Sequence, residues 1–253
     1  MEQVSKNDGK GLIKSVQKSL KILKYIIDAN EDVALSDIQK ALDYNVSTIH
    51  HLLKTLIEEG FVSQNKTTKR YYIGPEIFFT WLRGRRPENY FSRVTPILEE
   101  CVEATGETTN LFIRDNGEAL CITGSESPKT LRAFLRIGRR IPLPCTAAGK
   151  AFLINYTREE LKNYLKDTTK DLISLEEELK ISRQRGYTLE INEYEEMITA
   201  IGVPVFDRNG RVICTLSTIA PSTRVDEERI EFISNKLMDA SKKITELMLG
   251  VFY

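Results

Sequence analysis

Polar side chains repeat at helical spacing between residues 46 and 58, opposite an apolar stripe. The apolar stripe recurs every three or four residues and consists of Val46, Ile49, Leu53 and Leu56. That period predicts an amphipathic helix with the stripe facing inward. The outward and flanking positions then hold Ser47, Thr48, His50, His51 and Lys54. Hydroxyl, imidazole and ammonium groups on one helix face can contact base edges and phosphates, so the pattern predicts a reader of the DNA major groove.

A basic loop follows this helix at residues 65–70. The apolar runs on either side of it, Phe61-Val62 and Tyr71-Tyr72-Ile73, predict two short strands. The loop between them carries three cations, Lys66, Lys69 and Arg70. A hairpin of this kind is a wing whose cations would meet phosphates. The alternative is a solvated polar face on a domain that docks another protein, but the basic wing favours DNA.

Two further helices are predicted to position the reader. The first would bury a stripe formed by Val16, Leu20, Leu23 and Ile27. The second would begin at a capping box of Ser36 and Gln39, and Ser36 is also a candidate DNA contact. Residues 1–12 then form a disordered tail, and residues 13–74 a winged helix-turn-helix domain. A linker helix is predicted over residues 75–87 because Pro75 suits a first helical turn.

Residues 88–253 are predicted to form a mixed α/β sensor domain, which makes the whole chain α+β. The expected helices cover residues 88–105, 147–154, 158–165, 175–185 and 226–249. Capping boxes are expected at Thr157 with Glu160 and at Ser174 with Glu177. The expected strands cover residues 108–113, 119–124, 131–137, 187–191, 200–206 and 211–219, with a tight turn at Asp115-Asn116-Gly117. This order suits an antiparallel sheet flanked by helices.

Two prolines precede a start of small residues, Thr146-Ala147-Ala148-Gly149, in the predicted helix at 147–154. Free backbone N–H groups at a helix N-terminus favour an anion such as a carboxylate. The alternative is close packing of the helix on the sheet, which also requires small residues. The residue types alone leave both interpretations open.

An enzyme is the competing hypothesis for the second domain. Cys145 would be the nucleophile of a hydrolase or transferase, with Glu190, Glu193 or Glu196 as its acid partner. A thiolate nucleophile ordinarily needs a nearby base or cation, and both histidines lie in the predicted DNA reader. A buried structural thiol is therefore favoured. No phosphate-binding glycine motif occurs, so no cofactor is expected.

Composition narrows the remaining classes. The 36 basic and 36 acidic residues cancel, although residues 1–86 hold 14 Lys and Arg against 10 Asp and Glu. Four single cysteines and two adjacent histidines provide no metal-ligand set, because neighbouring helix residues diverge by about 100°. No apolar run reaches the roughly 18 residues of a membrane span. The chain is expected in the cytoplasm without metal or membrane contact.

Several motifs in order resemble the IclR family of bacterial transcription regulators. The motifs are the runs Ser15–Leu23, Ser47–Leu53, Arg136–Ala151, Arg185–Tyr187, Gly202–Gly210 and Leu216–Pro221. The resemblance implies a winged helix, a linker helix and a GAF-like effector-binding domain. It also implies that the protein is a homodimer or tetramer. Such a protein would act as a regulator, for example a repressor, that binds double-stranded operator DNA and responds to a small organic or aromatic acid.

The resemblance places the effector contacts in the second domain. They would be Thr146, Ala147, Ala148, Glu190, Ile198, Ala200, Ser217 and Ile219. Ala200 stands where several relatives have Cys, Ile219 where a second Ser is common, and Pro144 replaces a polar group. These departures predict a larger or less polar ligand, with Glu190 accepting from a hydroxyl or amine. A further hypothesis is a ligand-independent repressor whose pocket is filled by Ile219 and Met197.

Overall fold

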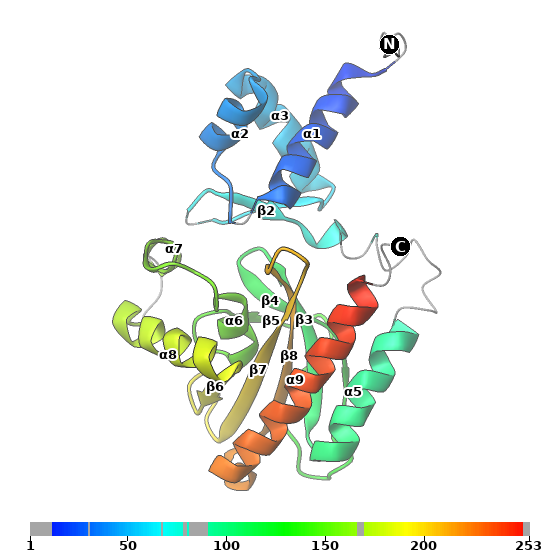
Figure 1. Cartoon of the computed structure of the whole chain (residues 1–253), viewed down its shortest axis with the longest axis vertical. Helices are drawn as coiled ribbons and strands as arrows, with labels where there is room; N and C mark the ends of the chain where they lie inside the picture. Colours follow the sequence, from blue (N-terminus) through cyan, green and yellow to red (C-terminus); the bar gives the residue numbers. More distant parts are fainter. Residues whose placement is uncertain are drawn as a thin grey trace, which may run out of the picture.

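The chain folds into two units that lie end to end (Figure 1). The computed structural model describes residues 12–29, 31–66, 68–77, 80, 91–165 and 170–249. The smaller N-terminal unit holds three helices and a hairpin, and the larger C-terminal unit holds one sheet with helices on both faces. The predicted tail and most of the predicted linker helix lie outside the described residues, although the backbone is helical at residues 75–77.

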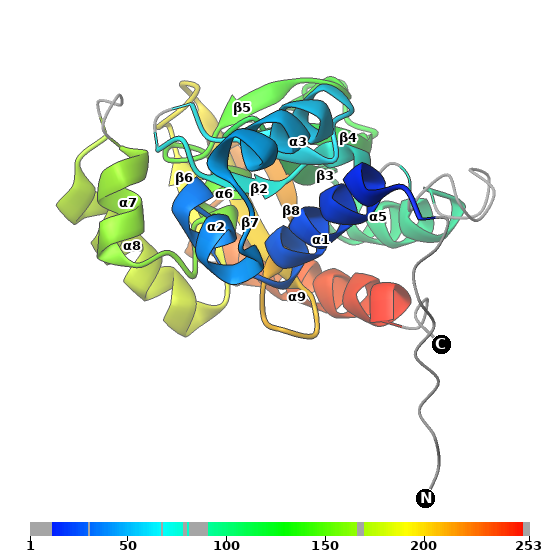
Figure 2. The same ribbon diagram turned by 90° about the horizontal axis from the view of Figure 1, so that it is seen from above.

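The N-terminal unit has the order helix, helix, helix, strand, strand. Its elements are α1 (Lys14–Asp28), α2 (Leu35–Leu42), α3 (Val46–Glu58), β1 (Val62–Gln64) and β2 (Tyr71–Ile73). The two strands pair antiparallel, and the three helices cross above them (Figure 2). The core is assembled from every element, including Ile22, Ile38, Leu53, Val62 and Tyr71. These residues form the predicted winged helix-turn-helix.

Three local predictions in this unit are wrong. Val46, predicted to face inward at the start of α3, is 47% exposed. Helix α1 buries Ile22 and Ile26, whereas Val16 and Leu20 are each 51% exposed. The apolar surface of α1 is therefore larger than the part of it that the core buries. Helix α2 begins one residue before Ser36, and the Asp37 carboxylate accepts from the Ala34 N–H at 2.9 Å. An aspartate in the first turn can satisfy this backbone donor without the predicted Ser36 box.

The C-terminal unit contains a six-stranded antiparallel sheet in the order β5-β4-β3-β8-β7-β6. The strands are β3 (Thr108–Asp115), β4 (Glu118–Ser125), β5 (Arg140–Pro142), β6 (Thr188–Ile191), β7 (Ile198–Phe206) and β8 (Val212–Pro221). Asn116 and Gly117 both have positive φ, 51° and 82°, as the predicted tight turn between β3 and β4 requires. The predicted antiparallel sheet is confirmed.

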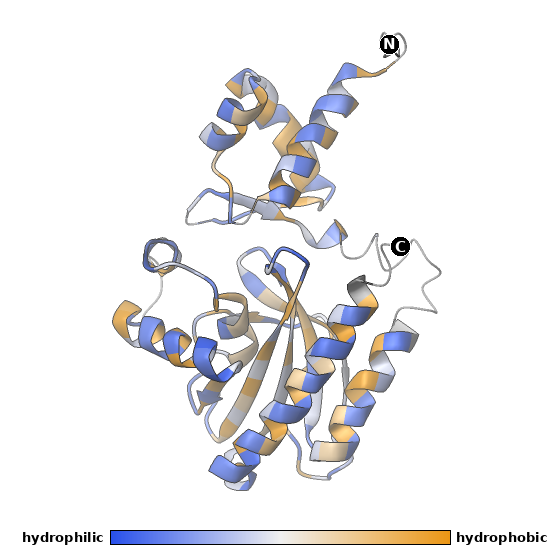
Figure 3. Ribbon diagram, in the orientation of Figure 1, coloured by the Kyte–Doolittle hydropathy of each residue, from blue (hydrophilic) through white to orange (hydrophobic). Residues whose placement is uncertain are grey.

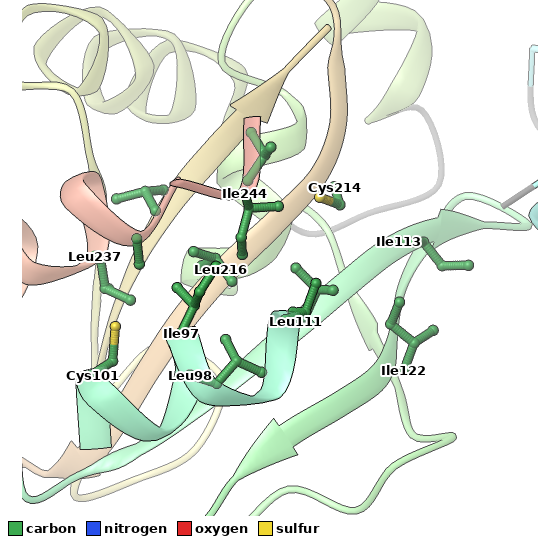
Figure 4. Packing of buried hydrophobic residues seen from close by; sticks show 14 of the residues in the cluster. Ile97, Leu98, Cys101, Leu111, Ile113, Ile122, Cys214, Leu216, Leu237 and Ile244 are labelled. Carbon is green, nitrogen blue, oxygen red and sulfur yellow. The ribbon is translucent and has the colours of Figure 1, made fainter. Parts of the chain in front are cut away.

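One face of the sheet is covered by two long helices. Helices α5 (Phe91–Thr105) and α9 (Glu227–Leu249) alternate between apolar and polar residues along their length (Figure 3), and their buried apolar residues belong to one cluster with those of the sheet. Leu98 and Leu237 pack against Leu111 and Leu216 of the central strands (Figure 4). This face therefore holds a hydrophobic core.

The opposite face is covered by shorter helices: α6 (Ala147–Phe152), α7 (Arg158–Tyr164) and α8 (Leu172–Arg185). The Thr157 and Glu160 capping box of α7 is confirmed. The predicted cap of α8 is wrong, because Asp171 accepts from the Ser174 N–H at 2.8 Å and starts the helix earlier. An aspartate at this position accepts from the free N–H groups of the first turn.

The predicted strand at residues 131–137 is absent, and these described residues form a loop. Their alternating pattern is real, yet Leu131, Phe134 and Ile137 are 70%, 50% and 65% exposed. The loop is anchored where the Thr108 hydroxyl donates to the Ala133 carbonyl at 2.7 Å. The place beside β4 belongs instead to β5.

Candidate functional site

The outer face of α3 carries the side chains predicted to read DNA. Ile49, Leu53 and Leu56 point into the core. Because an α-helix turns about 100° per residue, Ser47, His51 and Lys54 lie opposite Ile49, and all three are exposed. His50 is exposed beside them, and Thr48 is half-buried. The outer face of α3 is therefore exposed along its length and could enter the major groove of DNA.

Glu58 closes this face at the C-terminal end of α3. Its carboxylate lies 3.9 Å from the Lys54 ammonium, and each side chain is 67% exposed. Such an exposed pair contributes little to stability, so a phosphate can compete for Lys54. The negative charge of Glu58 would repel a phosphate at this end of the helix.

The wing divides its cations between solvent and the fold. Lys66 and Lys69 are exposed, whereas the half-buried Arg70 guanidinium donates to the Asp32 carbonyl at 2.6 Å. The loop is shaped by hydrogen bonds at Asn65, whose carbonyl accepts from Lys69 N–H at 2.9 Å and whose side chain accepts from Thr68 N–H at 3.1 Å. The wing therefore presents two lysines outward, and Arg70 supports its base.

The remaining candidates of the N-terminal unit are Ser36 and the two neighbouring histidines. Ser36 is exposed on α2. The rings of His50 and His51 are perpendicular, with centroids 6.3 Å apart. No group of three possible metal ligands gathers anywhere in the part of the chain that the structure describes.

The candidate effector residues gather on the sheet face beneath α6. Strand pairing sets Ile219 opposite both Thr108 and Ala200, and Ala200 opposite Glu190. Ser217 lies one pleat away on β8. Thr146, Ala147, Ala148, Glu190, Ala200 and Ser217 are all at most 4% exposed. Ile198 and Ile219 are partly exposed at the rim.

Helix α6 approaches the sheet as closely as its small residues allow. A Cβ added to Gly202 would lie 2.4 Å from the Ala147 carbonyl oxygen, and one at Gly149 would lie 2.3 Å from the Leu143 Cα. The Thr188 hydroxyl donates to the Ala147 carbonyl at 2.7 Å. Thr146 caps the helix, accepting from the Gly149 N–H at 3.2 Å. Close packing thus accounts for this small-residue segment.

Glu190 is already engaged by the backbone. Its Oε1 accepts from the Tyr194 N–H at 3.1 Å, which fastens the loop between β6 and β7. Burial raises the pKa of its carboxyl above the usual value, although the Tyr194 N–H and the Lys150 charge oppose that shift. Glu190 therefore orders the loop in addition to any contact with a ligand.

A cluster of ion pairs lies beside this loop and escaped the sequence analysis. The Lys150 ammonium, 2% exposed, contacts Glu178 at 2.6 Å and also pairs with Glu193. Lys170 pairs with the same two carboxylates. These contacts link α6, α8 and the loop after β6. Lys150 appears in sequence as one charge among many, so no residue pattern identified it.

Cys145 has the wrong environment for a nucleophile. Burial and the carboxylates of Glu193 and Glu190 raise the pKa of its thiol. A raised pKa keeps the sulfur protonated at neutral pH, whereas a thiolate nucleophile requires a lowered one. The acid partners that the enzyme hypothesis required thus oppose its chemistry.

A second feature that the sequence did not reveal joins the two units. The Arg114 guanidinium, at the end of β3, contacts both Asp32 carboxylate oxygens at 3.1 Å. It also stacks 4.3 Å from the centroid of the Tyr72 ring. The Tyr72 hydroxyl accepts from the Gly117 N–H at 2.6 Å, and burial raises its pKa to about 12. Arg211 adds a bond to the Ala29 carbonyl at 3.1 Å.

These features define a class of protein: a winged helix-turn-helix reader fixed to a second, sheet-based unit. Comparison with known proteins gives the family. The model of the IclR helix-turn-helix domain matches residues 15–66, and that of the bacterial transcriptional regulator IclR C-terminal domain matches residues 88–246. The chain belongs to the IclR family of bacterial transcriptional regulators. Its members bind operator DNA and small-molecule effectors, which supports a regulator over the hydrolase alternative.

Named relatives cover nearly the whole chain. The transcriptional regulator BhcR of Paracoccus denitrificans is 29% identical over 93% of this chain and 87% of its own length. The transcriptional repressor IclR of Escherichia coli is 28% identical over 93% and 90%. The crystal structure of the Thermotoga maritima IclR is similar with a TM-score of 0.59 and 29% identity, covering 92% of this chain and 98% of that one.

No helix within the described ranges is both long and apolar enough to cross a membrane.

Proposed function

We propose that this regulator reads its operator with the outer face of α3 and anchors itself through the wing. The observation that carries the proposal is the joint exposure of Ser47, His51 and Lys54 on α3 with Lys66 and Lys69 on the wing. Ser47, Thr48, His50 and His51 would supply groove contacts. Lys54, Lys66 and Lys69 would contact phosphates, with Ser36 at the edge and Arg70 supporting the wing.

The effector would occupy the sheet face beside α6, next to the loop between β6 and β7, because α6 itself packs directly on Gly202. Ser217, Ala200 and Glu190 are buried there, and Ile198 and Ile219 form an apolar rim. Met197 is 66% exposed and does not fill this site, so a ligand-independent repressor would have to fill it with Ile219 and other side chains. The apolar rim supports an effector with a sizeable apolar part, such as an aromatic acid or a derivative of one.

A homodimer or tetramer would present two readers to a palindromic operator. An exposed apolar stripe supports a second copy as partner. Leu12, Ile13, Val16 and Leu20 are 64%, 69%, 51% and 51% exposed along one end of α1. Contiguous apolar surface of this kind marks an interaction site.

Phosphate contacts by the wing can be tested by fluorescence anisotropy across a salt series. The variants are Lys66→Gln and Lys69→Gln, on duplex fragments from the regulator's own upstream region and on an unrelated duplex. Each variant should weaken binding to both duplexes and reduce the salt slope by about one, because each loses one released counterion.

The matched control is Lys242→Gln, which alters a lysine that is 75% exposed on α9. It should leave both affinity and slope unchanged. An altered sequence preference with an unchanged slope in Lys69→Gln would assign that lysine to base reading and contradict the phosphate role.

A further inference from the structure

Asn110, the third residue of β3, is buried with an unsatisfied amide nitrogen. It is 2% exposed, and its Nδ2 has no hydrogen-bond partner among the residues that the structure describes. Only two other buried side-chain atoms in that part of the chain share this state, Arg114 Nε and Thr215 Oγ1. An N–H group shut away from water without an acceptor costs folding free energy. A bound molecule with an acceptor would remove that cost.

Strand pairing places Asn110 directly beside the proposed effector site. A row of register partners crosses the sheet, from Gly124 on β4 through Asn110, Ser217 and Gly202 to Thr188 on β6. Directly opposite side chains have Cβ atoms about 5 Å apart. One ligand oxygen can therefore receive hydrogen bonds from both the Asn110 amide and the Ser217 hydroxyl.

The orientation of the amide is set from its other side. The Cys121 thiol lies 3.8 Å from both Asn110 Oδ1 and the Thr123 carbonyl oxygen, and burial raises the pKa of this thiol to about 12. The thiol is therefore a donor, which suits the amide oxygen. A Cβ at Gly124 would lie 2.2 Å from the same oxygen, so the glycine makes room for it. Nδ2 is left as the free end.

The charges around this row favour an uncharged acceptor. Glu190, in the neighbouring row, is an acid and would repel a carboxylate. Lys150 is turned to Glu178 and Glu193, and the row itself holds only neutral side chains. A buried carboxylate without a paired cation is costly, whereas a neutral carbonyl matches an amide N–H and a hydroxyl.

We propose that Asn110 determines effector specificity by donating, together with Ser217, to an uncharged carbonyl oxygen of the ligand. Amides, esters and ketones present such an oxygen, and an acid would have to direct its carboxylate elsewhere. This assignment rests on the proposed effector site beside α6. It adds to that site a residue on β3, a strand outside the contacts carried over from the family.

Matched probes test the assignment by thermal shift. Benzamide and methyl phenylacetate each carry one uncharged carbonyl group, and benzoate and phenylacetate are their acidic counterparts. The uncharged probes should raise the melting temperature of the wild type more than the acids do. Asn110→Leu, Asn110→Asp and Ser217→Ala should each weaken the response, with binding about tenfold weaker for a lost hydrogen bond. Asn209→Leu, in the exposed turn between β7 and β8, is the control.

The ligand-free proteins separate recognition from a structural role. Asn110→Leu replaces an unsatisfied amide by an apolar group of similar size, so its melting temperature without probe should equal or exceed that of the wild type. A marked drop would overturn the proposal, as would the absence of any shift of the wild type with both uncharged probes. Selective DNA binding is measured in parallel. If the wild type does not bind DNA selectively, the proposed function is refuted. If the variants bind DNA as the wild type does, only ligand recognition has changed.

Discussion

Glu190 is the residue of the proposed effector site whose ionisation opposes folding of the protein. It is 4% exposed, and burial raises the pKa of its carboxyl. For a carboxyl whose folded-state pKa lies above its unfolded-state pKa, the stabilising contribution is complete below the unfolded value. That contribution is lost as pH rises through the folded value. At neutral pH, the fold therefore holds a buried charge at a cost.

Glu190→Gln should be more stable than the wild type at neutral pH, because the amide oxygen can still accept from the Tyr194 N–H without a charge. The difference should shrink as pH falls below the ordinary pKa of a glutamate. Urea unfolding midpoints of both proteins over a pH series measure this. Glu196→Gln, at an exposed position of the same loop, is the control. A stability difference that does not vary with pH would contradict the prediction.

The residues of the DNA-reading face could be predicted from the sequence because a helix has one fixed period. Once Ile49 and Leu53 are assigned inward, the positions of Ser47 and His51 follow from geometry. Arg70 could not be placed in the same way. Its guanidinium turns toward Asp32, and 38 residues separate the two along the chain. Contacts of that range depend on tertiary packing, which a local pattern does not contain.

At the scale of the element, one end of α1 carries apolar side chains that stay exposed in the described fold. Val16 and Leu20 are four residues apart and so share one helix face. Ile22 and Ile26 serve the core on another face. Helix α1 thus has two apolar faces, of which only one is buried. The sequence pattern could not distinguish them, so the wrong residues were predicted for the core.

Leu20→Glu should weaken self-association, because it places a charge in the apolar stripe that we assign to a second copy. Light scattering over a concentration series should give a smaller average mass for the variant than for the wild type. Lys21→Glu, at an exposed polar position next to it, is the control. Equal masses of Leu20→Glu and wild type at every concentration would remove α1 from the interface.

The sheet was predicted well where turns and strand lengths are local. The Asn116-Gly117 turn fixed β3 and β4, and the antiparallel arrangement followed. The loop at residues 131–137 imitates a strand in its alternation, but β5 takes the place beside β4. An alternating pattern reports which side chains can face a sheet, not whether a sheet edge remains open. Asn110 did offer a signal, since an asparagine inside an apolar strand is disfavoured.

At the scale of the whole molecule, the contact of Arg114 with Asp32 and Tyr72 fixes the reader on the sensor unit. Arg114 and Asp32 side chains are each 16% exposed. Burial alone would lower the pKa of Arg114, but the Asp32 carboxylate raises it well above its usual value. Removing one partner of such a pair leaves an uncompensated charge, which costs about 3 kcal/mol.

A double-mutant cycle of Asp32→Asn and Arg114→Met should therefore give a coupling energy above about 1 kcal/mol in chemical unfolding. Calorimetry of Asp32→Asn should also show the N-terminal unit melting at a lower temperature than in the wild type. The control cycle uses Asp239 and Lys242, an exposed pair on α9 that should show almost no coupling. Additive effects at Asp32 and Arg114 would mean that the contact does not hold the units together.

Strand β3 carries Asn110 and Arg114 on one face, about 13 Å apart. The same rigid segment thus ends in the proposed ligand site and in the seat of the DNA reader. Energetic linkage between two sites is reciprocal: operator DNA must change ligand affinity by the factor by which ligand changes operator affinity. Operator DNA therefore acts on the ligand affinity of the C-terminal unit as an effector does. A metabolite concentration that saturates the free regulator will differ from the one that acts on the regulator already seated on its operator.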